Sequence, residues 1–205
     1  MIYLRTGFET VEFCVSNEEY RHVSHLETLI AEYLEWQGFL IRRNTKVGRR
    51  ERGGWEMELD VVGFNPISGR LVHYEPSLDA LTWSARELRY KKKFDAAKKY
   101  MFTELFSWLP PSTVIEQIAI FYNHPSGRDD IAGARIVSVD ELMAEIRAHV
   151  VACGPMIRNA IPEQYPLLRT IQLTHAGYRR PVNGTTQQEA PSKESCWRNV
   201  GVDAE

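Results

Sequence analysis

The sequence predicts an α/β fold in which layers of helices cover a mixed central β-sheet. Residues 20–37 show the three- and four-residue spacing of apolar side chains that is typical of an amphipathic helix. Residues 55–75 form two strand-like segments around a turn, and further helical and strand-like segments alternate up to residue 153. Alternation of this kind favours helices packed on a shared sheet.

Length and composition favour a single globular domain. The chain has 205 residues, enough for one domain with a buried core. Its 43% hydrophobic and 25% charged residues are ordinary for a globular protein. The formal net charge of −2 gives no overall preference for nucleic acid or for an anionic membrane. Any nucleic acid must therefore be bound by a local basic patch.

The cysteines indicate a reducing compartment. Cys14, Cys153 and Cys196 are odd in number, far apart and without a C-x-x-C pair, which suits neither a disulfide framework nor a zinc site. No apolar segment follows a basic start, and no run of about 18 apolar residues occurs. We therefore expect a cytoplasmic protein that does not span a membrane.

Composition divides the chain into four parts. We expect an N-terminal appendage (1–19), a core domain (20–153), a C-terminal extension packed on the core (154–181) and a flexible tail (182–205). The extension contains prolines and has no clear period, whereas the tail is polar and rich in Thr, Gln, Glu and Ser.

The core is predicted to begin with a helix over residues 20–37, which Gly38 ends. A strand over 39–47 follows, and then a basic, glycine-bounded loop over 48–54. The later elements are two strands over 55–64 and 70–75 joined by the turn NPISG, a helix over 83–108, a strand over 115–122, a further strand-like segment over 134–139 and a helix over 139–153. Pro76 is expected to end the third strand.

Two carboxylates are expected to face each other across the hairpin. Side chains alternate between the faces of a strand, so pairing Phe64 with Leu71 places Asp60 opposite Glu75. Like charges across an antiparallel pair are destabilising, and a bound Mg²⁺ or Mn²⁺ would remove the repulsion. The alternative is a shifted register, or an arginine that pairs with one acid. His73, on the face of Glu75, is the one histidine of interest.

A third acid, Glu27, falls within the apolar stripe of the first helix, between Val23 and Ile30. A lone carboxylate is expensive to bury there, so the position indicates a role at the acidic site. The alternative is a capping box, because Ser24 precedes Glu27 by three residues and Glu27 would then satisfy backbone donors at the helix start.

These three acids stand in sequence contexts that match a known family. Glu27 lies in HLETLIAEYLEWQGFLIRR, Asp60 in EMELDVVGF and Glu75 in RLVHYEPS. Over about residues 20–122 the chain resembles the PD-(D/E)XK, or restriction-endonuclease-like, superfamily. The resemblance implies an αβββαβ core, Mg²⁺ (or Mn²⁺) bound by the three acids, and hydrolysis of phosphodiester bonds in nucleic acid, with DNA favoured over RNA. Such motifs are short, so their coincidence with the predicted helix and hairpin gives the match its weight.

Two positions depart from the family pattern. Leu59 replaces the proline that precedes Asp60, and Ser77 occupies the lysine position of the E-x-K motif that Glu75 begins. Some members of the family carry this lysine on a neighbouring helix. Either a cation comes from elsewhere in this chain, or the site is catalytically inactive.

The helix over 83–108 offers four replacement cations. On a helical wheel Arg86 and Lys93 flank one side of its apolar stripe, and Lys91 and Lys98 flank the other. We choose Lys93 as the catalytic residue, because a lysine can lower its pKa in a partly desolvated site and orient water, whereas an arginine stays protonated. The alternative is a solvated helix face.

Positive charge is concentrated along the first strand and the loop after it. The expected contacts to a phosphate backbone are Arg42, Arg43, Lys46, Arg49, Arg50 and Arg52, with Arg86 and Lys91 of the long helix. A solvated loop is the alternative. The sequence thus predicts a Mg²⁺-dependent nuclease, with a catalytically inactive nucleic-acid-binding module as the alternative. It leaves open whether the protein acts alone or as a homodimer.

Overall fold

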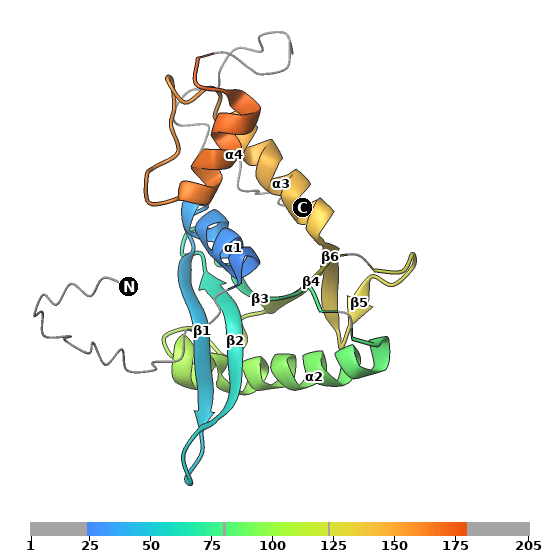
Figure 1. Cartoon of the computed structure of the whole chain (residues 1–205). Coiled ribbons are helices and arrows are strands. Elements are labelled where there is room, and N and C mark those ends of the chain that lie inside the picture. Colours follow the sequence, from blue (N-terminus) through green and yellow to red (C-terminus); the bar gives the residue numbers. More distant parts are fainter. Residues whose placement is uncertain (1–23, 80, 123, 180–205) are drawn as a thin grey trace, which may run out of the picture.

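The computed structural model describes residues 24–79, 81–122 and 124–179 (Figure 1). They form a six-stranded mixed sheet in the order β1-β2-β3-β4-β6-β5, with helices on both faces. The predicted α/β class, with helix layers on a mixed central sheet, is confirmed. In this part of the chain no helix combines the length and the apolar character needed to cross a lipid bilayer.

The elements alternate along the chain. The strands are β1 (Leu40–Arg49), β2 (Trp55–Phe64), β3 (Leu71–Ser77), β4 (Ile115–Phe121), β5 (Asp130–Ile131) and β6 (Ala134–Ser138). The helices are α1 (His25–Trp36), α2 (Trp83–Tyr100), the π-helix η1 (Met101–Leu105), α3 (Val139–Ala152) and α4 (Pro166–Ala176).

Strands β1, β2 and β3 are antiparallel neighbours, and β4 then runs parallel to β3. The β2–β3 register pairs Phe64 with Leu71, as predicted, and continues to the pair Val61–Tyr74. β6 is parallel to β4, and β5 is antiparallel to β6. β3 therefore has one antiparallel and one parallel neighbour in the interior of the sheet.

Asn65 fixes the turn between β2 and β3. Its Oδ1 accepts hydrogen bonds from the backbone N–H groups of Ile67 (2.9 Å) and Ser68 (3.0 Å). Its Nδ2 donates to the carbonyl of Gln37, just after α1, at 3.0 Å. An Asn that closes its own turn sets the hairpin register locally, and this one also ties the hairpin to α1.

Separate apolar cores cover the two faces of the sheet. On one face α1, α3 and α4 pack on strand residues such as Val61, Val72 and Ile118. On the other face α2 and η1 pack on residues that include Val62, Leu71 and Phe121. Figure 1 shows this division, with α2 across one side of the sheet and the β1–β2 hairpin projecting past it. We call the two faces the α1 face and the α2 face.

Regular strand alternation breaks down in the β1–β2 hairpin. Ile41 and Val61 pack in the core of the α1 face, whereas Val47 and Leu59 pack in the core of the α2 face. In a regular strand residues separated by an even number share a face. Asn44, with a left-handed φ of 47°, lies between the two regions and marks the point where the faces change. The end of the hairpin therefore packs towards α2.

Strand β3 does not end before Pro76, as the sequence predicted, but continues to Ser77. The pairs between β2 and β3 end at Tyr74, whereas β3 pairs with β4 through Ser77. The missing N–H of Pro76 thus falls where β3 no longer pairs with β2, so it costs no hydrogen bond on that side.

Two later segments also differ from the predictions. The long helix is α-helical only to Tyr100 and continues as the π-helix η1, so it stops short of residue 108. Helix α4 was not predicted, nor was the short strand β5. Pro166 stands at the start of α4, where its missing N–H costs no helical bond. The predicted helix start over 20–23, the appendage and the tail lie outside the described residues.

Candidate functional site

An ammonium group links the two predicted acids. Lys93, on α2, donates from Nζ to Asp60 Oδ1 on β2 at 2.8 Å and also to Glu75 Oε2 on β3. The side chains of Glu75, Lys93 and Asp60 are only 1%, 13% and 17% exposed. We call these three residues the acidic site.

The strand register brings the two acids together. Asp60 and Glu75 follow the pair Val61–Tyr74 in the antiparallel register, at the point where the ladder stops. The backbone N–H of Asp60 donates there to Glu75 Oε1 at 3.2 Å. The predicted apposition of the two acids is confirmed. A lysine, and not an arginine, stands between them.

Helix α2 is fixed so that Lys93 reaches the sheet. Tyr90 and Phe94 are buried on either side of it along the chain. The Tyr90 hydroxyl donates to the backbone carbonyl of Glu75 at 3.1 Å, and Gln117 Nε2 on β4 donates to the carbonyl of Phe94 at 3.0 Å. These contacts hold the helix over β3 and β4 and leave the lysine little freedom.

His73 orients Glu75 from within the core. It is fully buried, its Nε2 lies 2.7 Å from Glu75 Oε1, and its ring meets Phe94 edge-on. Burial lowers the pKa of His73 to about 3, so the ring is neutral at pH 7. We infer that Nε2 carries the proton, because a carboxylate only accepts. Glu75 Oε1 is thus held by His73 and by the Asp60 amide, and Oε2 by Lys93.

Asp60 binds its proton more tightly than an ordinary aspartate. Burial raises the pKa of Asp60 to about 7, and the charge of Glu75 adds to the rise, while Lys93 opposes it. A divalent cation at this place would favour the ionised form.

Lys93 remains charged. Burial acts to lower its pKa, but the carboxylates of Glu75 and Asp60 outweigh burial and hold the pKa above the ordinary value. The expectation that partial desolvation lowers the pKa of this lysine is wrong, because two acids stabilise the ammonium form. Lys93 is therefore a hydrogen-bond donor and a positive charge, and not a base.

Glu27 lies in the first turn of α1. Burial raises the pKa of Glu27, the charge of Asp60 adds to the rise, and hydrogen bonds from the Asn44 side chain and the Ser24 amide lower it. Ser24 makes no side-chain cap, so only half of the alternative capping box is present. The charges of Asp60 and Lys93 both act on Glu27, so it lies near the acidic site, but among the described residues the three acids do not form a group that could hold a metal ion.

The other candidate cations of α2 are engaged elsewhere or exposed. Arg86 Nε bonds Asp79 Oδ1 at 3.3 Å, and Lys91 pairs with Asp95 at 2.9 Å in an exposed pair. Lys98 is exposed. Ser77, at the family's lysine position, donates from Oγ to Asp79 Oδ2 at 2.6 Å. Among the four replacement cations, Lys93 is the one that the structure brings to Asp60 and Glu75.

The basic residues of the hairpin do not form one continuous surface. Arg42, Arg43, Arg49, Arg50 and Arg52 are exposed, and Lys46 is half-buried. Arg42 is paired with Val62, on the α2 face with Asp60, whereas Arg43 is paired with Val61, on the α1 face. Their binding of nucleic acid stays a prediction, and Arg42 is the better placed of these two arginines.

The predicted metal site of three acids, Glu27, Asp60 and Glu75, is not formed in the described part of the chain, where only Asp60 and Glu75 lie together. Within residues 24–79, 81–122 and 124–179, no group of three or more His, Cys, Asp or Glu side chains is arranged to hold a metal ion. Mg²⁺ is commonly held by one or two carboxylates, with waters and substrate phosphates completing its shell. Asp60 and Glu75 supply two carboxylates. The Asn44 side chain, beside Glu27, contributes a buried oxygen that has no hydrogen-bond partner. All are oxygen ligands, which suit Mg²⁺ or Mn²⁺.

Sequence reasoning missed Asn44. By the β1–β2 register it stands opposite Asp60, although that pair itself is not formed. Setting the β1 register from the basic loop could have found it, because the pairs on either side place residue 44 beside the aspartate.

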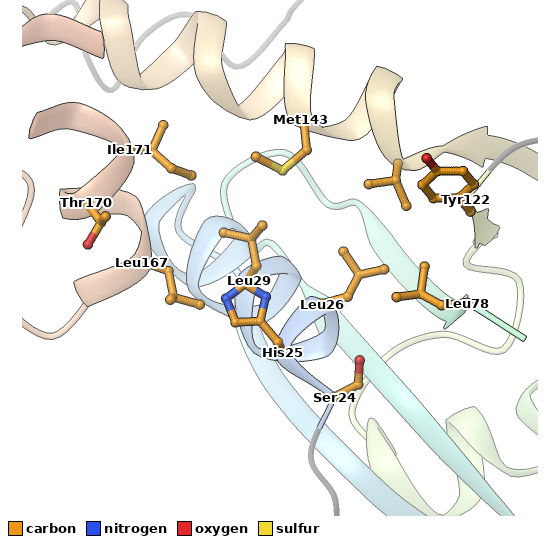
Figure 2. A pocket seen from close by; sticks show the side chains of 11 residues that line it. Ser24, His25, Leu26, Leu29, Leu78, Tyr122, Met143, Leu167, Thr170 and Ile171 are labelled. Atoms are coloured by element: carbon orange, nitrogen blue, oxygen red, sulfur yellow. The ribbon is translucent and has the colours of Figure 1, made fainter. Parts of the chain in front are cut away.

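A cavity of about 550 Å³ lies on the α1 face, between α1, α3 and α4 (Figure 2). Leu26, Leu29, Met143, Leu167 and Ile171 face it, with Leu78 beyond the end of β3. Its lining is almost wholly apolar, so it offers no cluster of groups for acid–base or metal chemistry. The reactive groups are gathered at the acidic site.

Comparison with known proteins identifies no family for this chain. No protein-family model matches the chain, and no curated protein matches it. A crystal structure described as a protein of unknown function, AF1548, is similar over 72% of this chain and 77% of that chain, with 16% identity and a TM-score of 0.41. A similarity at this level carries no argument about fold or function.

Proposed function

We propose that the chain is a metal-dependent nuclease of the PD-(D/E)XK type that hydrolyses phosphodiester bonds, with DNA favoured over RNA. The observation that carries the proposal is the Lys93 ammonium between Asp60 and Glu75. The E-x-K lysine of the family is replaced by Ser77 in this sequence. A lysine delivered from α2 supplies the missing positive charge at the same two acids.

The arrangement of the elements supports the proposal. A helix that carries Glu27 precedes three antiparallel strands, a second helix and a strand parallel to the third. This is the αβββαβ order that the family resemblance implies. Asp60 and Glu75 stand on the middle and last strands of the three, and the charge of Asp60 acts on Glu27 of α1.

In this proposal the acids, His73 and Lys93 have different roles. A Mg²⁺ or Mn²⁺ ion held by Asp60 and Glu75, with Glu27 beside them, would polarise the scissile phosphate and lower the pKa of a bound water. His73 keeps Glu75 in one orientation, because it donates to Oε1 and leaves Oε2 towards Lys93. Lys93 stays protonated and can therefore orient water or stabilise negative charge on the phosphate. It does not remove a proton.

A catalytically inactive nucleic-acid-binding module is the second candidate. One observation favours it: Lys93 already bonds both carboxylates, so the two acids are compensated in part without a metal ion. On this interpretation the acidic site stabilises the fold only, and the protein neither binds Mn²⁺ there nor cleaves nucleic acid.

Cleavage assays decide between the two. Purified protein is incubated with plasmid, single-stranded and branched DNA and with RNA, with Mg²⁺, with Mn²⁺ and with chelator. The nuclease proposal expects cleavage that requires the metal and falls about 10²-fold or more in Asp60→Asn, while DNA binding is retained. Asp95→Asn, in an exposed pair on α2, is the matched control and should cleave normally. Retained binding with no cleavage of any substrate would favour the inactive module.

A further inference from the structure

In the described part of the chain, two buried side-chain polar atoms lack a hydrogen-bond partner: His73 Nδ1 and Asn44 Oδ1. Both belong to residues that flank the acidic site, since His73 bonds Glu75 and Asn44 stands opposite Asp60 in the β1–β2 register. A buried acceptor without a partner lowers stability. Such an atom calls for an explanation by a bound water, an ion or a catalytic role.

The backbone of Asn44 has its own structural explanation. Its φ of 47° lies in the left-handed region, between the regular pairs Arg43–Val61 and Thr45–Leu59. This is where the two strands change the face that they present to α2. Glycine adopts the same backbone with less strain than any other residue. The change of face therefore requires a left-handed residue, but it does not require the Asn side chain.

The side chain of Asn44 has two ends with different surroundings. Its amide nitrogen donates to Glu27, as the lowering effect of this hydrogen bond on the Glu27 pKa indicates. Its Oδ1 is buried and without a partner, opposite Asp60 in the register. A carbonyl oxygen only accepts, so it cannot bind a phosphate oxygen, which also accepts. Its partner must be a cation or a water molecule that donates to it.

We propose that Asn44 is a neutral oxygen ligand of the divalent cation held at Asp60 and Glu75. The inference rests on the proposed function, because it needs a metal ion at the acidic site. It adds a third oxygen-bearing side chain to Asp60 and Glu75. An amide carbonyl is a hard oxygen ligand of the kind that Mg²⁺ and Mn²⁺ accept, and it adds no further negative charge.

The test measures Mn²⁺ binding by calorimetry and by electron paramagnetic resonance, with no nucleic acid present. In Asn44→Gly the backbone strain is relieved and the oxygen is lost. We expect its Mn²⁺ affinity to fall about tenfold or more. Its thermal unfolding midpoint without metal should equal or exceed that of the wild type, because glycine suits the left-handed backbone. A purely structural role for the side chain would leave Mn²⁺ affinity unchanged.

Two further variants complete the design. Ala132 has the other positive φ among the described non-glycine residues, 52°, in the β5–β6 turn at the opposite edge of the sheet. Ala132→Gly therefore relieves the same kind of strain without touching the site, and its Mn²⁺ affinity should equal that of the wild type. Asn44→Asp keeps an oxygen at the position and should bind Mn²⁺ at least tenfold more tightly than Asn44→Gly.

The outcomes separate the two proposals. If the wild type and Asn44→Gly bind Mn²⁺ equally, while the wild type cleaves DNA, the nuclease proposal stands and the role of Asn44 is refuted. If the wild type binds no Mn²⁺ and cleaves no substrate, both proposals are refuted. Tenfold weaker binding in Asn44→Gly alone, with binding restored in Asn44→Asp, supports the assignment.

Discussion

Two ionic clusters involve residues of α2, and they differ in their balance of charge. In the acidic site one cation, Lys93, serves two acids, Asp60 and Glu75. In the second cluster two arginines of α2 serve one acid, Asp79, because Arg86 and Arg89 bond its two carboxylate oxygens at 3.3 and 2.9 Å.

The pKa values of the two aspartates are consequently shifted in opposite directions. Burial raises the pKa of Asp60 to about 7, and the nearby acid adds to the effect. Burial would also raise the pKa of Asp79, but hydrogen bonds from Ser77, from the Leu81 amide and from Arg86 hold it below its usual range. Burial acts in the same direction at both sites, so the neighbouring charges and donors decide the outcome. The acidic site is the one in which acids outnumber cations.

Removal of Lys93 should have the largest effect. Lys93→Ala leaves Asp60 and Glu75 without their cation, and breaking a buried ion pair costs about 3–5 kcal/mol of unfolding free energy. The cost should be larger at pH 8 than at pH 6, because Asp60, with a pKa of about 7, takes up a proton at the lower pH. We expect cleavage to fall about 10²-fold or more with DNA binding nearly unchanged. Denaturant unfolding at both pH values and single-turnover cleavage measure these effects.

Two control variants test whether the effects of Lys93→Ala are specific to this lysine. Lys92 is exposed, so Lys92→Ala should change neither stability nor cleavage appreciably. Lys93→Arg retains the charge and should recover much of the stability, although its different geometry should still reduce cleavage. An equal loss of binding and cleavage in Lys93→Ala would identify the lysine as a phosphate contact instead.

The parts of the fold that were predictable have local causes. Strand β2 begins and ends where the sequence placed it, because Asn65 closes the following turn with its own side chain. Other boundaries depend on tertiary contacts that the sequence pattern does not show. Pro76 is accommodated because β3 has lost its β2 partner at that point, and α4 is stabilised by packing Leu168 beneath α1 and α3.

The site was predictable where simple geometry decides. Strand parity placed Asp60 opposite Glu75, and the helical wheel placed Lys93 at the edge of the apolar stripe of α2, together with Arg86, Lys91 and Lys98. The direction of the Lys93 pKa shift was not predictable, because it depends on two buried carboxylates acting together. The position of Asn44 opposite Asp60 could have been derived from the β1 register, but its left-handed φ and its missing hydrogen-bond partner are properties of the folded chain.

A change in pH dependence should follow from Asp60→Asn in the metal-free protein. The folded-state pKa of Asp60, about 7, lies above its unfolded value, so Asp60 stabilises the fold most below pH 4 and less as the pH rises to 7. His73 acts oppositely, because its folded pKa of about 3 lies below the unfolded value, and its destabilising effect grows as the pH falls below 6.5. In the wild type these two slopes oppose each other between about pH 4 and 6.5.

When Asp60 is replaced, only the contribution of His73 to the slope of unfolding free energy against pH remains. The unfolding free energy of Asp60→Asn should rise from pH 5 to pH 6.5 more steeply than that of the wild type, by up to about 1.4 kcal/mol per pH unit. Denaturant titrations in the presence of chelator measure both slopes. Identical slopes would show that Asp60 is ionised in the folded protein throughout this range, contrary to the charge balance described above.

Substitution in the second cluster, formed by Asp79, Arg86 and Arg89, should change stability and cleavage less. Asp79→Asn breaks two ion pairs that are partly exposed, and such pairs contribute about 0–1 kcal/mol each. We expect a small loss of unfolding free energy and unchanged cleavage, because Asp79 bonds Ser77, Arg86 and Arg89 and not the residues of the acidic site. Thermal unfolding and the plasmid assay suffice for the measurement. A loss of cleavage as large as that of Lys93→Ala would place Asp79 in the reaction and remove the distinction between the clusters.

The smallest effect concerns how nucleic acid approaches the acidic site. Arg42 and Arg43 are adjacent, exposed and of equal charge, yet the β1–β2 register puts Arg42 on the α2 face with Asp60 and Arg43 on the α1 face, where its charge acts on Glu32. A phosphate backbone that reaches Asp60 passes over the α2 face.

Arg42→Ala should therefore weaken DNA binding by less than about tenfold and reduce the slope of log affinity against log salt by about one, uniformly across sequences. Arg43→Ala should leave both quantities unchanged. Fluorescence anisotropy over a range of salt concentrations measures the two variants side by side. Equal losses would mean that DNA follows the edge of β1 and contacts both faces, in which case proximity to the acidic site does not determine which cations bind it.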